Sequence, residues 1–345
     1  MPSLTFAEFG VDAGCGNLLG VQPWLEAADY ASAGRFEARL EGYLRAAAEK
    51  GWLTPRTIVL FPEYTGTWLV AVDESPALYR ASTIEQGMRR LIVRRLPAYL
   101  RALFAARAPD RFRAALFHLK AKRMAHIYQT VFAALARRYG VTVVAGSIVL
   151  PEPDIVAGVL TPGDGPLQNV CLVFRPDGSP YPRLVRKAFP IEAERPFTAS
   201  ASPASLPTFD TPAGRLGVLI CADSWYPEPY AVLKAQQPDL LAVPSFLSPA
   251  GVWNQPWGGY DGAPPPADTD PADAGRLTEG EAWLKYALAG RMHAAGARCG
   301  LNVFLRGRLW DMGSDGRAVA VRGTSVEVAP ATEGPLLVNC WIPAP

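Results

Sequence analysis

Residues 217–228 read Gly-Val-Leu-Ile-Cys-Ala-Asp-Ser-Trp-Tyr-Pro-Glu, so an apolar run ends abruptly at Cys221 and gives way to small and polar residues. The pair Pro227-Glu228 suits the first turn of a helix. This order predicts a strand, a sharp turn and a helix, with Cys221 on the turn. A thiol there would lie near backbone N–H groups that no helical carbonyl uses, and these favour a thiolate or an oxyanion. The alternative is a buried cysteine that only fills space at a strand end.

The composition indicates a globular protein with a substantial core. The chain has 345 residues, 49% of them hydrophobic, which is enough for one large domain or two. Its 34 basic and 32 acidic residues nearly cancel, so the overall balance suggests neither nucleic acid nor an anionic membrane as a partner. The N-terminus lacks the pattern of a signal peptide, and no uncharged apolar segment approaches bilayer length. We therefore expect a cytoplasmic protein.

The cysteines and histidines do not form a recognisable framework. The chain has an odd number of cysteines without a Cys-x-x-Cys pair: Cys15, Cys171, Cys221, Cys299 and Cys340. This spacing argues against a disulfide scaffold and against a cysteine-based zinc site. The histidines are His118, His126 and His293, too few for a histidine-rich metal site. A Cys-His catalytic pair stays open, because such partners are usually distant in sequence.

Apolar runs of the type that is buried in a sheet recur along the chain. They cover residues 57–61, 141–148, 239–244 and 301–305, with shorter strands expected near Ala318 and Ser325 and over 336–342. Helices are expected over residues 36–47, 229–236 and 279–297, and a hairpin is expected between 169–174 and 184–185, around Pro176-Asp177-Gly178. Since no internal repeat or clear linker separates these elements, we predict one α/β domain over residues 1–345.

Two segments differ in composition from the rest. Residues 84–138 are rich in Ala, Leu and Arg and are interrupted by Pro97 and Pro109, which predicts two or three helices. Their acids are few, so this segment could bind an anion or a partner, although a solvated face or a subunit contact is the simpler interpretation. Residues 248–278 are rich in Gly, Pro, Asp and Trp and are expected to form a long surface loop, the kind that often acts as a lid.

Two further side chains with chemical potential follow predicted strands. Glu63 comes directly after the run 57–61, in Phe-Pro-Glu-Tyr, and the carboxyl ends of strands are where ligands collect in open α/β sheets. Lys187 follows the second arm of the hairpin, in Arg-Lys-Ala-Phe-Pro. With Cys221, three reactive side chains thus leave three strands in succession.

In this order, Glu63, Lys187 and Cys221 resemble the nitrilase, or carbon-nitrogen hydrolase, superfamily. The family's cysteine motif C-x-D-x-x-x-P-E is matched over residues 221–228, and residues 186–195 are similar to its R-K-x-x-P-x-x-x-E-R version. The second match places Glu194 at the family's auxiliary glutamate. The resemblance implies a four-layer α-β-β-α sandwich and a homodimer or higher homo-oligomer built through one helical layer.

The resemblance also implies a role for each site residue. Cys221 would be the nucleophile and Glu63 the general base, because a thiol with its ordinary pKa needs a base to attack. Lys187, with the backbone N–H of Ala222, would stabilise the oxyanion. Glu194 would orient Lys187 or the amine of the substrate. No step requires a metal or an organic cofactor.

The residues beside this triad are the expected lining of a substrate pocket, although aromatic residues could equally belong to the core. They are Tyr64, Phe189, Trp225, Ser245 and Phe246. Such a lining would favour an apolar or planar acyl group.

The expected substrate is a small linear amide that releases ammonia or an amine. Ala222-Asp223 is similar to amidase-like branches of the superfamily, whereas nitrilases tend to have Trp-Glu there. The run 186–195 is instead nitrilase-like, so nitrile hydrolysis is the alternative. Acyl transfer to an amine and an inactive binding module of the same fold are further alternatives. In the family's R-A-x-E-N pattern on the late helix, this chain keeps only Arg291. The segments 84–138 and 248–278 are longer than in a minimal member and are expected to reshape substrate access.

Overall fold

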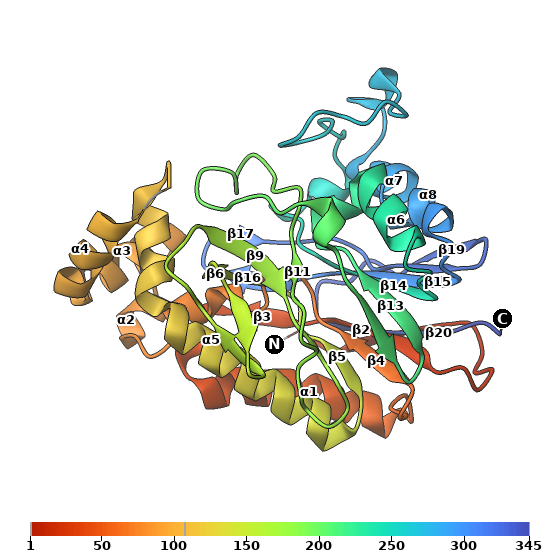
Figure 1. Cartoon of the computed structure of the whole chain (residues 1–345), viewed down its shortest axis with the longest axis horizontal. Coiled ribbons are helices and arrows are strands. Elements are labelled where there is room, and N and C mark those ends of the chain that lie inside the picture. Colours follow the sequence, from red (N-terminus) through yellow and green to blue (C-terminus); the bar gives the residue numbers. More distant parts are fainter. Residues whose placement is uncertain (1, 107, 345) are drawn as a thin grey trace.

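Two stacked β-sheets with helices on both outer faces make up the body of the protein (Figure 1). The computed structural model describes residues 2–106 and 108–344, so Arg107, in the predicted helical segment, lies outside it. Each of the two main sheets has six strands. The predicted α-β-β-α sandwich is therefore confirmed.

The first sheet has the strand order β1-β20-β2-β4-β5-β10. Its strands are β1 (Thr5–Phe9), β20 (Leu336–Trp341), β2 (Asn17–Gln22), β4 (Thr57–Leu60), β5 (Thr142–Val144) and β10 (Val173–Phe174). The neighbours β2, β4 and β5 run parallel, and both faces of β4 are covered, which explains its continuous apolar sequence. Val59 of β4 packs in one core with α1 (Ala33–Glu49) and α5 (Arg111–Tyr139), whereas Ile58 belongs to the core shared with the second sheet.

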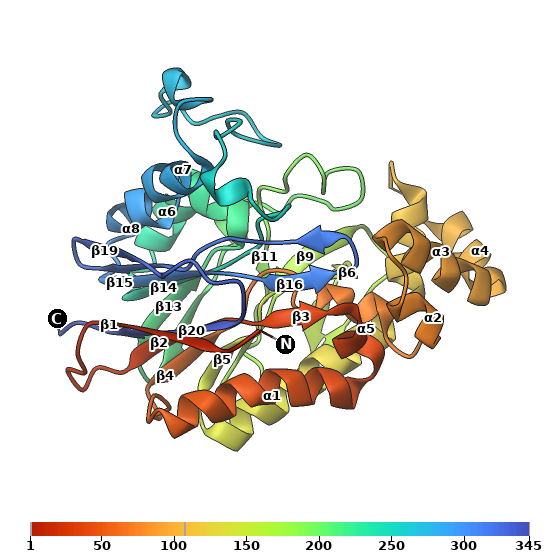
Figure 2. The same cartoon turned by 180° about the vertical axis from the view of Figure 1, so that it is seen from behind.

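The second sheet has the strand order β12-β13-β14-β15-β18-β19. Its strands are β12 (Thr208–Thr211), β13 (Gly214–Val218), β14 (Leu240–Ser245), β15 (Cys299–Phe304), β18 (Val319–Arg322) and β19 (Ser325–Val328). Its outer face is covered by α6 (Pro227–Lys234), α7 (Glu279–Tyr286) and α8 (Leu288–Ala295) (Figure 2). The two sheets approach closely at Gly20 of β2, where an added Cβ would lie 2.6 Å from Val303 of β15.

Smaller elements flank the sandwich. The strands β6 (Ile148–Pro151), β9 (Leu167–Cys171) and β11 (Val185–Arg186) form one small sheet, and β3 (Trp24–Glu26), β16 (Arg306–Leu309) and β17 (Met312–Gly313) form another. A separate hairpin consists of β7 (Asp154–Val156) and β8 (Val159–Thr161). In the predicted hairpin, β9 and β11 do pair antiparallel, and the chain turns between them at Gly178.

The helical segment 84–138 contains three helices, in agreement with the prediction of two or three. They are α3 (Ile84–Arg94), α4 (Leu96–Ala105) and α5, and a single turn, α2 (Pro76–Tyr79), precedes them. Pro97 lies in the first turn of α4, where its missing N–H costs nothing. Asp110 caps α5 by accepting a hydrogen bond of 3.0 Å from the N–H of Arg113. Residues 248–278 form a loop, as predicted, with only short 3-10 turns at Val252–Asn254 and Pro271–Asp273.

The prediction of a single strand over residues 141–148 was wrong, because the segment contains β5 and the start of β6. The chain leaves the first sheet after β5 and enters the small sheet with β6. Gly146 lies between them at a φ of 71°, and an added Cβ would lie 2.2 Å from the carbonyl oxygen of Pro62. The continuous apolar sequence hid this turn, because both halves are buried.

The helix predicted over residues 279–297 is divided into α7 and α8, which was also not foreseen. Ala287 leaves the helical region, with ψ at −147°. The guanidinium of Arg291 donates a hydrogen bond of 2.8 Å to the carbonyl of Tyr286 and pairs with Asp268 at 2.7 Å. Arg291 thus binds the end of α7 to the long loop. In the described part of the chain, no helix is both long and apolar enough to span a bilayer.

Candidate active site

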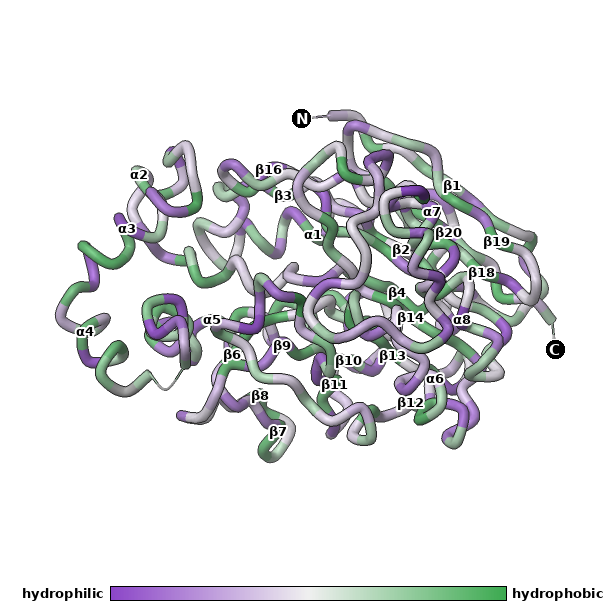
Figure 3. Tube along the Cα trace, turned by 90° about the horizontal axis from the view of Figure 1, so that it is seen from above, coloured by the Kyte–Doolittle hydropathy of each residue, from purple (hydrophilic) through white to green (hydrophobic). Residues whose placement is uncertain are grey.

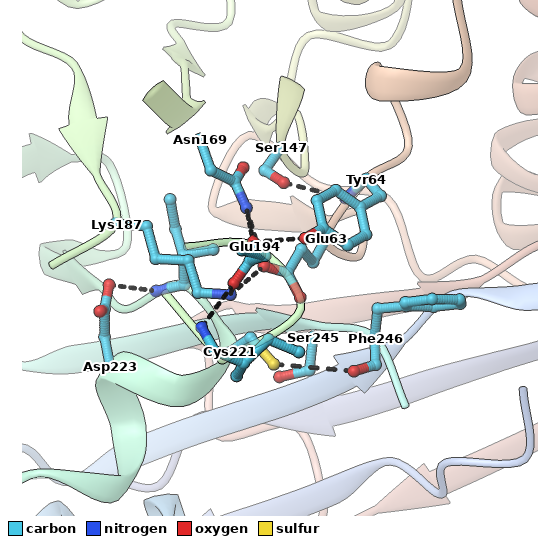
Figure 4. A network of polar contacts seen from close by, with 12 residues as sticks. Glu63, Tyr64, Ser147, Asn169, Lys187, Glu194, Cys221, Asp223, Ser245 and Phe246 are labelled. Atoms are coloured by element: carbon cyan, nitrogen blue, oxygen red, sulfur yellow. Dashed lines mark hydrogen bonds and ion pairs between the residues drawn. The ribbon is translucent and has the colours of Figure 1, made fainter. Parts of the chain in front are cut away.

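A buried ion cluster lies at the carboxyl ends of strands from both main sheets and the small sheet (Figure 4). The Lys187 Nζ lies 2.8 Å from Oε1 of Glu63 and 2.6 Å from Oε2 of Glu194. All three residues are at most 2% exposed. Charges this deep persist only when they are paired and hydrogen-bonded, so the cluster is a built feature of the fold.

Each charged residue enters the cluster from a different element. Glu63 lies just beyond β4, and Lys187 comes directly after β11. Glu194 lies in the turn that follows, where the N–H of Ile191 donates to its Oε2 at 2.9 Å. The ends of strands from separate sheets therefore meet at one point. Glu63 and Lys187 are in contact there although they are 124 positions apart in sequence.

Asn169 of β9 connects the two carboxylates, and sequence analysis gave it no role in the site. Its Nδ2 donates to Oε1 of Glu63 at 2.9 Å and to Oε1 of Glu194 at 3.1 Å. Its own Oδ1 is buried and has no hydrogen-bond partner among the described residues. The only signal was a polar residue at the start of the predicted strand 169–174, whose other residues are apolar.

Tyr64 is attached to the same cluster. Its hydroxyl donates to Oε1 of Glu194, and its backbone N–H donates to Oγ of Ser147 at 2.9 Å. The φ of Tyr64 is 63°, in the left-handed region that a bulky residue rarely adopts. This strained turn directs Glu63 and Tyr64 to the same centre.

Cys221 begins a 3-10 turn, η4 (Cys221–Trp225), three residues after β13 ends. The predicted turn is therefore present, but the strand ends at Val218 and not at the cysteine. The φ of Cys221 is 50°, again left-handed, and its Sγ lies 3.7 Å from the carbonyl oxygen of Phe246. The N–H of Ala222, in the first turn of η4, has no carbonyl partner within that turn.

Asp223 connects the turn that begins at Cys221 to the segment that follows Lys187. Its Oδ1 accepts hydrogen bonds from the N–H groups of Ala188 at 2.9 Å and Phe189 at 2.8 Å, and its Oδ2 accepts from Ile220 at 3.3 Å. From the sequence, Asp223 was predicted only to mark an amidase-like branch. In the structure it fixes the position of Lys187 relative to Cys221.

The electrostatics keep Lys187 charged. Burial by itself would lower the pKa of Lys187, but the adjacent charges of Glu194 and Glu63 raise it well above the ordinary value. Burial opposes ionisation of Glu194, yet Lys187 and the hydrogen bonds to the carboxylate lower its pKa. Lys187 and Glu194 therefore form a stable ion pair.

For Glu63 and Cys221, the surroundings favour the neutral form instead of the charged form. Burial raises the pKa of Glu63, and the charge of Glu194 raises it further against the effect of Lys187. Burial also raises the pKa of the Cys221 thiol well above its ordinary value, and the charge of Glu63 adds to this. The arrangement thus contains a neutral thiol beside a carboxylate that is more basic than usual. Burial likewise raises the pKa of Asp223, to about 7.

The five expected pocket residues fall into different surroundings. The rings of Tyr64 and Phe246 contact each other, with centroids 5.7 Å apart, beside Glu194 and Cys221. Phe189 stacks on Tyr226 at 3.9 Å.

Two of the expected pocket residues are packed elsewhere. Trp225 packs against Trp257, Tyr260 and Trp283, rings of the long loop and α7. Ser245 is fully buried, and its Oγ accepts a hydrogen bond from Asn302 at 2.7 Å. The structure therefore brings Tyr64 and Phe246 to the cluster, and it surrounds Trp225 and Ser245 with packing partners. A substrate contact by any of the five remains a prediction.

Among residues 2–106 and 108–344, no group of three or more His, Cys, Asp or Glu side chains is arranged to hold a metal ion.

Comparison with known proteins places this geometry in context. The sequence model of the carbon-nitrogen hydrolase family matches residues 38–259, well over half of the chain. No curated protein sequence matches this chain. Among solved structures, the carbon-nitrogen hydrolase from Helicobacter pylori G27 is similar with a TM-score of 0.58 and 16% identity, over 94% of this chain and 88% of that one.

An amidase from Nesterenkonia sp. AN1 is also similar, with a TM-score of 0.52 and 14% identity, over 95% of this chain and 93% of that one. That structure is of a variant of the amidase, and in it acrylamide has undergone Michael addition at the active-site cysteine. At such identities the structural likeness shows a shared fold, and the match to the family's sequence model shows the family. The chain belongs to the carbon-nitrogen hydrolase family.

Proposed function

We propose that this protein is an amidase that hydrolyses small linear amides through a thioester on Cys221, with Glu63, Lys187 and Cys221 as its catalytic triad. The observation that carries the proposal is the buried cluster in which Glu63 and Lys187 lie 2.8 Å apart and interact electrostatically with the Cys221 thiol. A buried ion pair contributes little net stability, which favours a chemical role for these charges.

The first step is attack of the Cys221 sulfur on the amide carbon. The thiol is protonated at rest because burial raises its pKa, so Glu63, whose own pKa is raised by burial, accepts the proton as the S–C bond forms. The carbonyl π electrons move to oxygen. The Lys187 ammonium and the N–H of Ala222 stabilise that oxyanion, each by about 3 to 4 kcal/mol.

The second step releases the amine and the third releases the acid. Protonated Glu63 gives its proton to the amide nitrogen, the C–N bond breaks, and a thioester remains on Cys221. Glu63 then accepts a proton from water as the water oxygen attacks the thioester. The C–S bond breaks and protonated Glu63 returns its proton to the sulfur, which restores both the thiol and the carboxylate. One amide and one water thus yield one carboxylic acid and one amine.

Lys187 serves as a charge and not as a base. Its pKa is raised well above the ordinary value by Glu194 and Glu63, so it holds its proton throughout the cycle. Glu194 accepts hydrogen bonds from Lys187, Tyr64 and Ile191, and these contacts fix the carboxylate in place. Glu194 is thus the positioning residue for Lys187.

Nitrile hydrolysis is the second candidate, favoured by the nitrilase-like run 186–195. A panel of short amides and the matching nitriles, supplied to the purified protein with ammonia measured, separates the two. We expect ammonia from amides, and turnover of nitriles alone would contradict the amidase proposal. Hydroxamate formation with added hydroxylamine would indicate acyl transfer, and no turnover of any substrate would favour a binding module.

A matched pair of cysteine variants tests the nucleophile in the same assay. Cys221→Ala should abolish turnover, because no other residue in the mechanism can form the thioester. Cys15→Ala should retain it, since Cys15 is half-buried near the N-terminus and takes no part in the cluster.

A further inference from the structure

The protein carries an exposed apolar surface at the end of the sandwich where α3 and α4 project (Figures 1 and 3). We call this surface the helical tip and define it by five exposed side chains: Val93, Leu96, Leu100, Phe104 and Phe112. Val93 is 70% exposed, Phe104 is 82% exposed and Phe112 is 66% exposed. Half of the large exposed hydrophobic residues in the described chain therefore lie within 20 positions.

Apart from Arg101, the helix α4 contains no charged residue, and yet it is only partly buried. Tyr99 faces inward and donates a hydrogen bond of 3.3 Å to the carbonyl of Phe112, at the start of α5. Leu96, Leu100 and Phe104 follow one another at intervals of four residues, so they share one face of α4 beside Tyr99, and all three are exposed. A helix with so many apolar residues is normally buried, so its exposed face is expected to contact another apolar surface.

The charge of the segment that forms the tip indicates which kind of partner would bind there. Residues 84–113 contain eight arginines and only two acids, Glu85 and Asp110, whereas the rest of the chain has 26 basic and 30 acidic residues. Arg89 and Arg101 are exposed and have neither an ion pair nor a hydrogen-bond partner among the described residues. Arg94 and Arg95 pair with Glu74 and Arg113 pairs with Asp110, which neutralises part of this charge. The segment still carries an excess of positive charge within a nearly neutral protein, and its complement is an anionic surface.

A second copy of the chain fits this surface poorly. A two-fold contact through the tip would bring the same arginines together, and like charges at an interface oppose association. The homodimer implied by the family resemblance would accordingly use another face. Large apolar side chains that project between arginines are instead typical of helices that lie in the interface of an anionic membrane.

We propose that the helical tip docks the protein on anionic lipid bilayers, with Leu100 and Phe104 entering the apolar boundary and Arg89 and Arg101 contacting lipid phosphates. The proposal differs from the expectation, drawn from the overall charge, that the protein has no anionic membrane as a partner. The overall charge is a sum over the basic segment 84–113 and a remainder that is slightly acidic. The tip contains none of the proposed catalytic residues, so the proposed function and the docking surface stand or fall separately.

Sedimentation with lipid vesicles tests the proposal. The full chain should bind vesicles of equal parts phosphatidylcholine and phosphatidylglycerol, bind phosphatidylcholine alone far more weakly, and lose binding as salt rises. Loss of two arginine charges in Arg89→Glu/Arg101→Glu should weaken binding by roughly thirtyfold or more. Leu100→Ser/Phe104→Ser should weaken it at least as much, because it removes the inserted side chains.

Two matched variants control for a general effect on the surface. Val326→Ser changes an exposed apolar residue of β19, and Arg183→Glu changes an exposed arginine outside the tip, so both should bind as the unchanged protein does. Absence of binding to the phosphatidylglycerol vesicles would overturn the proposal in favour of an acidic protein partner. A dimer in sedimentation velocity that Leu100→Ser/Phe104→Ser dissolves would overturn it in favour of self-association.

Discussion

At the scale of the residue, Asn169 shows how this site keeps two glutamates beside one lysine. Its amide donates to both carboxylates at 2.9 and 3.1 Å. Asn169→Ala should lower kcat by roughly tenfold to a hundredfold, because hydrogen bonds to charged groups are worth about 1.5 to 3 kcal/mol. Gln168→Ala is the control: the adjacent Gln168 contacts Arg186 instead of the cluster and should retain activity. Equal losses in both variants would show that β9 matters only as a scaffold.

Glu194 should also control the pH at which the enzyme begins to work. Burial first and the charge of Glu194 next raise the pKa of Glu63, and the base must be ionised to accept a proton. Activity therefore falls as the pH drops through that raised pKa. Glu194→Gln removes the charge, so the acid limb of the residual kcat/KM profile should move to lower pH. The exposed Glu192, changed to Gln, should leave the limb in place. A shift to higher pH in Glu194→Gln would contradict this electrostatic account.

The sequence identified the reactive side chains of the cluster but not the residues that hold them in place. Glu63, Lys187 and Cys221 come after strands, and Glu194 shares a short motif with Lys187, so all four could be selected from the sequence. Asn169 forms its bonds with residues 25 and 106 positions away, and no local pattern encodes such contacts. The packing around Trp225 could not be predicted either, because its ring partners belong to the long loop and to α7.

At the scale of the element, the turn between β5 and β6 supports the segment that carries Glu63. An added Cβ on Gly146 would lie 2.2 Å from the carbonyl oxygen of Pro62, and φ there is 71°. Gly146→Ala should therefore lower the free energy of unfolding by roughly 3 kcal/mol or more, from strain and overpacking together. Thermal denaturation followed by circular dichroism measures this loss.

Gly140 provides the matched control at the end of α5. Its φ of 62° is equally left-handed, but nothing lies within 4 Å of an added Cβ. Gly140→Ala should cost only the conformational strain, about 1 to 2 kcal/mol. If both variants lost the same stability, the contact with Pro62 would have no energetic role.

Elements were predictable where one period or one composition persisted. The helix α1 and the strand β4 follow their apolar patterns closely. The divisions between β5 and β6 and between α7 and α8 were missed, because each is accompanied by a contact with a distant segment: the approach of Gly146 to Pro62, and the ion pair of Arg291 with Asp268.

At the scale of the whole molecule, the two sheets must approach closely for Glu63 and Cys221 to meet. Gly20 of β2 allows this, since an added Cβ would lie 2.6 Å from Val303 and 2.9 Å from Leu301 of the opposite sheet. Gly20→Ala should destabilise the protein by about 1 to 3 kcal/mol through overpacking. Gly42→Ala, in α1 with open space around it, should instead stabilise by up to about 1 kcal/mol. A higher Tm for Gly20→Ala would contradict the close packing described here.

The layered architecture could be predicted because ordered motifs identified a family, and the family implies the layers. The arrangement of charge over the surface could not, because net charge is a sum over the chain. Residues 84–113 are strongly basic while the remainder is acidic, and only the structure shows that this segment also exposes large apolar side chains.

The central claim is that Cys221 carries the acyl group of an amide substrate. Mass spectrometry of the protein quenched in acid during turnover tests it most directly. We predict a mass increase equal to the acyl group on the peptide that contains Cys221, absent from Cys221→Ala and lost when the substrate is exhausted. Turnover that continues in Cys221→Ala, or an adduct found only on another residue, would contradict the account.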